Sequence, residues 1–300
     1  MGLEPIHMIF AKNIIKKYGE QIAVNELSLD IPQGQFFGLL GPNGSGKTTS
    51  IHMLSTLIKP TSGSIFIDGI DVKKSPQTVR QNIGLVFQES ALDRTLSIEE
   101  NLYFCAGLHN LNKKAVSTKV NALLELFELQ SKKHNAVGSL SGGMRRAVDI
   151  IRGVLHQPKV LFLDEPTVGL DLPSRRRIWR FIKKLIDEQQ LTVVLTTHYL
   201  EEAAPCDNVA FIKEGALVSE GAPQRLIQQL GEKIIEINGS NVNEFAKQLA
   251  LKKHEYMIEG DTLLIRVKDS ETKKIDSVQS ALRDRAEVIS VRKSNLNDVF

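Results

Sequence analysis

A glycine-rich octapeptide, Gly41–Thr48, carries the clearest chemical signal in the chain. Its letters, GPNGSGKT, fit the pattern G-x-x-x-x-G-K-[ST], and it lies between an apolar run and a segment of helical character. Backbone N–H groups in such a loop turn toward an anion at a helix start, where the helix dipole favours negative charge. We therefore predict a loop that binds the phosphates of a nucleotide.

The side chains of this loop have distinct chemical uses. Lys47 would reach the β- and γ-phosphates, the Thr48 hydroxyl would bind Mg²⁺, and the Thr49 hydroxyl would add a phosphate contact. The residues that we expect to bind the nucleotide here are Gly41, Pro42, Asn43, Gly44, Ser45, Gly46, Lys47, Thr48 and Thr49.

Two carboxylates, Asp164 and Glu165, directly follow the apolar run Val160–Leu163. On a strand, adjacent side chains point to opposite faces. We therefore expect Asp164 to hold Mg²⁺, directly or through water, while Glu165 faces an attacking water. Because an unpaired buried charge is very costly, buried carboxylates need partners of this kind.

The elements that must position these residues alternate between short apolar runs and segments of helical periodicity. This alternation predicts an α/β fold with a mainly parallel, doubly wound sheet. The expected strands are 36–40, 64–67, 83–87, 160–163, 192–196 and 209–213. The expected core helices are 47–57, one that begins at Ser75-Pro76, and one that includes 178–185. A helical insert is expected near 97–155, since Ser97 and Glu100 have the spacing of a capping box.

The composition shifts after about residue 231, and the pattern becomes β-α-β-β-α-β. This is the order of a small α+β module of the ferredoxin-like type. Its expected strands are 234–237, 256–258, 263–267 and 288–291, with helices near 242–250 and 272–284. We therefore predict two domains, 1–230 with a helical subdomain at about 89–155, and an accessory domain at 231–300.

A further motif, Leu140–Arg146 (LSGGMRR), lies a short way upstream of the two carboxylates. It resembles the signature motif of ATP-binding cassette (ABC) ATPases, and the likeness runs over about residues 6–230. The chain is similar to ATP-binding subunits of drug-resistance and polysaccharide or lipid exporters of the ABC-2 type, which share LSGGMRR and DEPTVGLD. The resemblance implies a P-loop NTPase cassette that binds ATP and Mg²⁺ and hydrolyses ATP.

The resemblance also implies roles for single residues. Tyr18 resembles the adenine-stacking aromatic, and Gln88 the Q-loop glutamine. Asp171 resembles the D-loop aspartate, and His198 the switch histidine that contacts the γ-phosphate. The expected catalytic residues are then Lys47, Gln88, Glu165 and His198, and the expected metal ligands are Thr48, Gln88 and Asp164.

The start of the signature helix is a second candidate anion site. Ser141, Gly142 and Gly143 leave backbone amides bare at a helix N-terminus. One chain does not easily bring two such helix starts to one γ-phosphate, and the family's arrangement is a head-to-tail homodimer. The resemblance further implies an integral membrane permease as a separate partner, through which the protein sits on the inner face of the cell membrane.

The amino-acid composition excludes several other classes of protein. The 300 residues are 42% hydrophobic and 24% charged, which suits a globular protein and excludes a fibrous or disordered one. The 38 basic and 35 acidic side chains do not favour nucleic acid as a partner. Two cysteines are too few for a disulfide framework, and no run approaches ~18 apolar residues. We expect a cytoplasmic protein.

One alternative stays open at this stage, a soluble ABC ATPase that does not transport, such as the cofactor-assembly type. A single phosphate-binding loop argues against translation-type members, which carry two cassettes in one chain. The gap from Thr48 to Ser141 leaves no room for the long coiled coil of repair-type members. The transported substrate is not encoded here, because the translocation path belongs to the permease.

Overall fold

The computed structural model describes residues 7–230, 233–239, 241–249, 256–267, 272–282, 286 and 288–293. The chain divides between Glu220 and Gly221 into two compact units. The sequence placed this boundary after residue 230, and helix α8 (Pro223–Leu230) accounts for the difference because it falls in the second unit. The ends of two expected helices, residue 250 and residues 283–284, lie outside the described residues.

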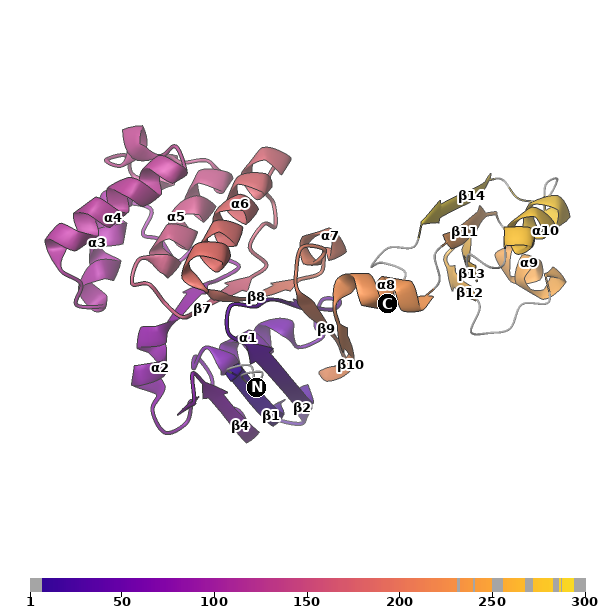
Figure 1. The fold of residues 1–300 in the computed structure, drawn as a ribbon, viewed down its shortest axis with the longest axis horizontal. Helices are drawn as coiled ribbons and strands as arrows, with labels where there is room; N and C mark the ends of the chain where they lie inside the picture. Colours follow the sequence, from indigo (N-terminus) through magenta and orange to yellow (C-terminus); the bar gives the residue numbers. More distant parts are fainter. Residues whose placement is uncertain are drawn as a thin grey trace, which may run out of the picture. The chain divides into compact units, whose positions relative to one another are not determined.

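A six-stranded sheet forms the centre of the first unit (Figure 1). In spatial order its strands are β10 (Ala216–Gly221), β9 (Asn208–Lys213), β3 (Phe36–Leu40), β8 (Thr192–Thr197), β7 (Val160–Asp164) and β6 (Ile83–Val86). The pairs from β9 to β6 are parallel, which confirms the predicted mainly parallel sheet. Every residue of β3, β7 and β8 is buried, as expected for central strands covered on both faces.

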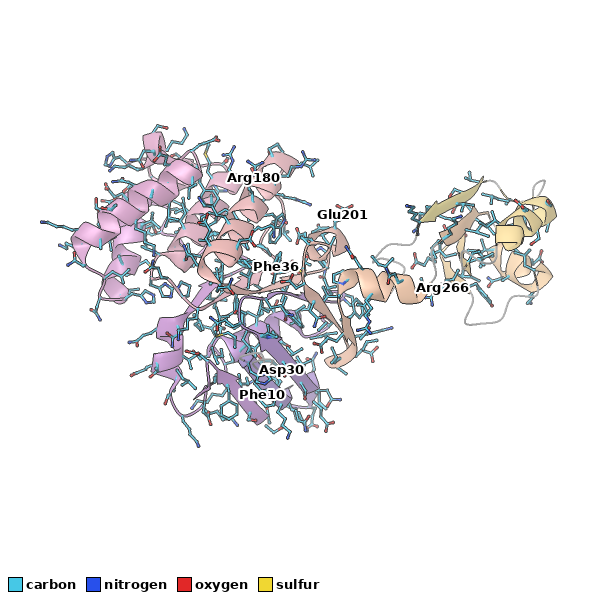
Figure 2. The ribbon with its side chains drawn as sticks, viewed as in Figure 1. Phe10, Asp30, Phe36, Arg180, Glu201 and Arg266 are labelled. Atoms are coloured by element: carbon cyan, nitrogen blue, oxygen red, sulfur yellow. The ribbon has the colours of Figure 1, made fainter. Side chains whose placement is uncertain are left out.

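An antiparallel sheet lies beside it, in the order β2-β1-β4-β5. Its strands are β1 (His7–Tyr18), β2 (Gln21–Pro32), β4 (Ser62–Ile67) and β5 (Ile70–Asp71). The hairpin of β4 and β5 was expected, whereas β1, β2 and β10 were not. Phe10 and Asp30 pair across β1 and β2 on the exposed face of this sheet (Figure 2).

Helix α1 (Lys47–Leu54) joins the two sheets, since it contacts β2 on one side and β7 and β8 on the other. A single apolar core includes Ile51 of α1, Val24 of β2 and Phe162 of β7. The helix ends at Leu54 rather than at residue 57, because Thr56 takes a left-handed φ of 69°. This packing holds the start of α1 at the edge of the parallel sheet.

Helices α3, α4 and α5 form the expected helical insert, and α6 lies beside them (Figure 1). The elements of this region and its approach are α2 (Pro76–Asn82), α3 (Ile98–Leu108), α4 (Lys113–Leu126), two short 3₁₀ turns (Gln130–Lys132 and Val137–Ser139), α5 (Gly142–Val154) and α6 (Leu172–Gln189). The capping box at α3 is confirmed, because Ser97 and Glu100 bond to each other's backbone N–H groups. The short helix α7 (Leu200–Ala203) follows β8.

The second unit has the predicted β-α-β-β-α-β order. It consists of β11 (Lys233–Asn238), α9 (Val242–Gln248), β12 (Tyr256–Glu259), β13 (Thr262–Val267), α10 (Thr272–Leu282) and β14 (Val288–Lys293). Its sheet has the order β12-β13-β11-β14 with antiparallel pairs, the arrangement of a ferredoxin-like module. A core of its own includes Ile235, Phe245 and Ile265. Among the described residues of both units, no helix is both long and apolar enough to cross a membrane.

Helix α5 approaches β6 closely because two glycines face each other there. A Cβ at Gly84 of β6 would lie 2.1 Å from the carbonyl oxygen of Gly153 in α5. Only backbone fits in that space, so Gly84 sets the distance between the helical insert and the sheet.

We predict that Gly84→Ala lowers the free energy of unfolding by about 1–3 kcal/mol, because the added methyl group overpacks this contact. Urea unfolding measures the change. Gly107→Ala is the matched control, since a Cβ at Gly107 of α3 meets nothing within 4 Å. That substitution should raise stability by about 1 kcal/mol through helix propensity alone. Equal effects of the two substitutions would contradict the close approach.

Candidate active site

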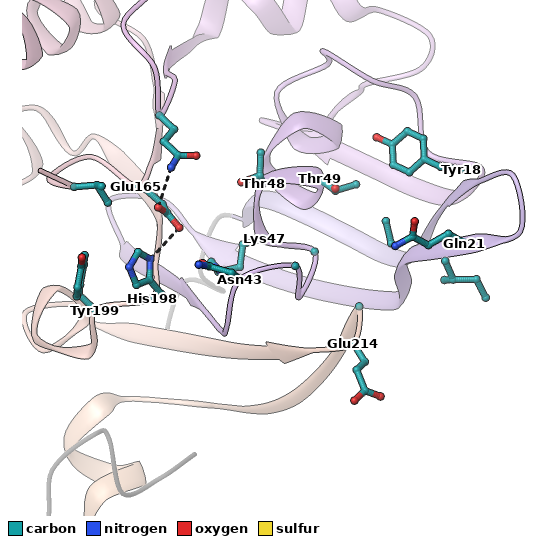
Figure 3. A pocket seen from close by; sticks show the side chains of 17 residues that line it. Tyr18, Gln21, Asn43, Lys47, Thr48, Thr49, Glu165, His198, Tyr199 and Glu214 are labelled. Atoms are coloured by element: carbon teal, nitrogen blue, oxygen red, sulfur yellow. Dashed lines mark hydrogen bonds and ion pairs between the residues drawn. The ribbon is translucent and has the colours of Figure 1, made fainter. Parts of the chain in front are cut away.

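A cavity of about 860 Å³ opens where the parallel strands end (Figure 3). It is bordered by the turn between β1 and β2, the loop before α1, the segments after β6, β7 and β8, and the turn between β9 and β10. The expected nucleotide-binding and catalytic residues that line it are Tyr18, Asn43, Gly44, Gly46, Lys47, Thr48, Thr49, Gln88, Glu165 and His198.

The loop before α1 takes a shape that needs glycine at two positions. Gly41 has a φ of +152°, and a Cβ there would lie 2.2 Å from the carbonyl oxygen of Ile212. Gly46 has a φ of +101°, and a Cβ there would lie 2.4 Å from the carbonyl oxygen of Ala23. Gly46 is also the N-cap of α1 and has no side chain to cap it, so the first N–H groups of the helix can bind an anion.

Lys47 lies buried over this loop. Its ammonium group donates hydrogen bonds to the carbonyl oxygens of Gly41 at 2.8 Å and Pro42 at 2.9 Å. Burial lowers the pKa of Lys47, while the negative charges of Glu165 and Asp164 oppose that effect. A cation held here by two carbonyls and two nearby carboxylates is placed to meet phosphate oxygens.

Asp164, the last residue of β7, is buried against two hydroxyl groups. Thr48 of α1 donates to its Oδ1 at 3.1 Å, and Thr196 of β8 donates to the same oxygen at 2.5 Å. Hard oxygen donors are the ligands that Mg²⁺ prefers, and phosphates and water commonly complete its shell. The donor set therefore fits Mg²⁺ bound with a nucleotide. No cluster of three His, Cys, Asp or Glu side chains that could hold a metal occurs within the described ranges.

Glu165 corrects one step of the sequence argument. Strand β7 ends at Asp164, and Glu165 takes a left-handed φ of 43°, so strand alternation does not aim its side chain. Its N–H group instead donates to the carbonyl oxygen of Thr196 at 3.2 Å and to the hydroxyl of Thr196 at 3.1 Å. A non-glycine residue in this region stores strain, a feature that clusters at functional sites.

The Glu165 carboxylate brings together two other predicted residues (Figure 3). His198 Nδ1 lies 3.1 Å from Glu165 Oε1, and Gln88 Nε2 donates to Glu165 Oε2 at 3.3 Å. These three side chains reach the cavity from the ends of three different strands, β6, β7 and β8.

Four expected residues lie together at a second place. Ser141 caps α5 and accepts a hydrogen bond from the Met144 N–H group at 3.3 Å. A Cβ at Gly143 would lie 2.5 Å from Ser174 Oγ and 3.9 Å from Asp171 Oδ1, so the starts of α5 and α6 are adjacent. Ser141, Gly142, Gly143 and Asp171 are not among the described residues that line the cavity.

Several contributors were not predicted. Thr196 and Arg146 form hydrogen bonds to Asp164 and Glu165 without lining the cavity. The unpredicted lining residues are Gln21, Ile22, Ala23, Val168, Tyr199, Glu214 and Gly215. The turn signal Glu214-Gly215 after an apolar run marked two of these positions, Arg146 ends the motif LSGGMRR, and Val168 lies within DEPTVGLD. The others carried no signal in the sequence.

Sequence comparison places this site in a known context. Residues 24–168 match the family described as ABC transporter. A Nod factor export ATP-binding protein I from Burkholderia lata is 36% identical over 299 residues, which cover 99% of this chain and 96% of that protein. The protein of the same name from Rhizobium etli is 36% identical over 291 residues, 96% of this chain and 90% of its own length.

Solved structures agree at the level of the cassette. A dimeric ATP-binding cassette in a post-hydrolysis state, bound to ADP and phosphate, is 29% identical with a TM-score of 0.67. It covers 72% of this chain and 98% of its own. An ATP-binding subunit of an ABC transporter, 25% identical with a TM-score of 0.69, covers 74% of this chain and 92% of its own.

Proposed function

Since the chain belongs to the ATP-binding proteins of ABC transporters, we propose that it is the ATPase subunit of an exporter whose permease is a separate chain. One observation carries the proposal. Glu165, Gln88 and His198 converge on the cavity that the phosphate-binding loop borders. This arrangement serves an ATP hydrolase, and the relatives named for export favour transport over the soluble alternative.

Catalysis on ATP needs positioning and charge stabilisation more than covalent chemistry. The loop N–H groups and Lys47 hold the phosphates, and Tyr18 at the rim contacts the adenine ring. Mg²⁺, held by Thr48, Asp164 and Gln88, would neutralise charge on the phosphate oxygens. Glu165 takes a proton from the attacking water as the bond from the γ-phosphorus to the ADP oxygen breaks. His198 stabilises the γ-phosphate.

The two anion-binding helix starts support a site shared between chains. The cavity is bordered by the start of α1, while the start of α5 lies with Asp171 at another place in the same unit. A head-to-tail homodimer would bring the Ser141–Gly143 amides of one chain to the γ-phosphate held by the other. ATP then holds the dimer closed, hydrolysis opens it, and the permease follows this cycle.

A surface groove supports the proposal that the permease docks on this unit. A cavity of about 530 Å³ lies between β6, α3 and α5, and its lining includes Arg80, Phe104, Leu108 and Arg152. Phe104 and Leu108 are 66% and 69% exposed, which is unusual for large apolar side chains. The segment from Gln88 leads directly into this groove. We assign it to an amphipathic cytoplasmic helix of the permease, whose apolar face would cover Phe104 and Leu108.

The assignment of the base predicts that Glu165→Gln keeps ATP binding and loses nearly all turnover, because the amide cannot take a proton from water. An ATP-stabilised dimer should then accumulate and be visible by gel filtration. Glu128→Gln is the matched control, since Glu128 is also a left-handed glutamate, with a φ of 58°, but is exposed and pairs with Arg177. Normal steady-state hydrolysis by Glu165→Gln would rule out this base.

The shared site predicts complementation between two inactive chains, Lys47→Ala and Ser141→Arg. In their mixed dimer one site carries both defects, while the other combines an intact loop with an intact signature. Isolated mixed dimers should therefore trap one ATP each, and each homodimer should trap none. Trapped nucleotide is the measurement, because coupling between the sites could suppress hydrolysis. If each chain used its own signature, mixing would trap no ATP above either homodimer.

The docking groove predicts disulfide crosslinks to the permease from cysteines placed at Phe104 and Leu108. The native free thiols, Cys105 and Cys206, are first replaced by serine and alanine. A cysteine at Val218, which is exposed on β10 outside the groove, is the control position. Crosslinked product should form from the groove and not from Val218. Absence of product from both groove positions would contradict the docking proposal.

A further inference from the structure

Arg146 of helix α5 is a buried arginine, only 7% exposed, and its partners are backbone carbonyls. It donates to the carbonyl oxygens of Pro166 at 2.6 Å, Asp164 at 3.0 Å and Glu165 at 3.2 Å, and to that of Phe87. These acceptors belong to the ends of two neighbouring strands, β6 and β7. One guanidinium therefore joins the segment that carries Gln88 to the segment that carries Glu165.

Arginine suits this position for reasons of geometry and charge. Its planar group presents five N–H donors in a fixed fork, more than any other side chain offers. Burial lowers the pKa of Arg146, and the charges of Asp149, Asp164 and Glu202 oppose that effect, so the cation is retained among carboxylates. Removal of the fork would leave buried carbonyl groups without partners.

Glu165 is held through both of its peptide groups. Thr196 accepts hydrogen bonds from its N–H group, and Arg146 donates to its carbonyl oxygen. Two fixed ends constrain the residue to its left-handed φ of 43°, and this conformation directs the carboxylate toward Gln88 and His198. Removal of Arg146 would release one of these two constraints on the residue that carries the carboxylate.

Arg146 also connects this peptide to the signature. It lies four residues after Gly142, the first residue of α5, which is a rise of about 6 Å along the helix. A helix is rigid over one turn, so a displacement of its start is passed to Arg146 and from there to Glu165.

We propose that Arg146 is a positioning residue for hydrolysis. It holds Glu165 and Gln88 beside the nucleotide of its own chain. The start of the same helix contacts the nucleotide of the partner chain, so a shift of that start moves Arg146 and, with it, Glu165 and Gln88. The inference rests on the proposed function, because it takes Glu165 as the base and the signature as a contact made across the dimer.

A double-mutant cycle tests this link, with the chain itself, Arg146→Lys, Glu165→Gln and the double variant. Lysine keeps the charge and loses the fork. Single-turnover hydrolysis of ATP gives the chemical step, and nucleotide affinity is measured separately. Arg146→Lys should slow hydrolysis about 100-fold, the cost of a small misplacement of a reacting group, and leave affinity unchanged. In the Glu165→Gln background, Arg146→Lys should change the residual rate by less than about threefold. The effects of the two substitutions do not add, because Arg146 acts through Glu165.

Two readouts separate positioning from a purely structural role. The Glu165→Gln chain should still form its ATP-stabilised dimer when Arg146→Lys is added. Arg177→Lys, which alters an arginine that bonds the Phe127 carbonyl away from the site, should keep the normal rate. If Arg146→Lys does not fold, Arg146→Gln, which buries no charge, enters the same cycle.

Each outcome decides the inference. The inference is supported if Arg146→Lys slows single-turnover hydrolysis only in the chain that keeps Glu165. An unchanged rate, additive losses in the two backgrounds, or loss of nucleotide affinity overturns it and leaves the proposed function standing. Normal hydrolysis by Glu165→Gln overturns the base assignment, and the inference falls with it because no base is left to position.

Discussion

The parallel pairing of β3, β8 and β7 is the constraint on which the site depends. In this register Leu40 pairs with Thr197, and Asp164 pairs with Thr196, so the three strands end at one edge of the sheet. The residues that follow the strands are Gly41, His198 and Glu165. The loop before α1, His198 and Glu165 therefore meet although they are far apart in sequence. A slip of one strand by one residue would turn its side chains to the other face and separate the three.

Much of this arrangement could be predicted because its determinants are local. The loop before α1 offers backbone N–H groups rather than particular side chains, so the spacing of its glycines is enough to identify it. Strands buried on both faces, such as β3 and β7, read as unbroken apolar runs. The ferredoxin-like order of the second unit and the capping box at Ser97 are likewise written in short stretches of sequence.

The features that could not be predicted depend on contacts between distant segments. Strand β1 lacks a regular alternation, because its register shifts and Asn13 takes a φ of 46°. Gly63 of β4 packs on Asn13, where a Cβ would lie 2.4 Å from the Asn13 carbonyl oxygen. The acceptors of Arg146 are backbone carbonyls, which no sequence pattern displays. The aim of Glu165 depends on a backbone conformation that its neighbours impose.

On the proposed assignment of Glu165 as the base, its left-handed conformation sets the need for a carboxylate against the stability of the fold. A glutamate at a φ of 43° costs about 1 kcal/mol of strain that an asparagine would largely avoid, because asparagine tolerates this region. The non-glycine residue with the least backbone strain at this position is thus asparagine, whose shorter amide side chain cannot act as a base. On the proposed assignment, asparagine at this position would relieve the backbone and at the same time remove the base.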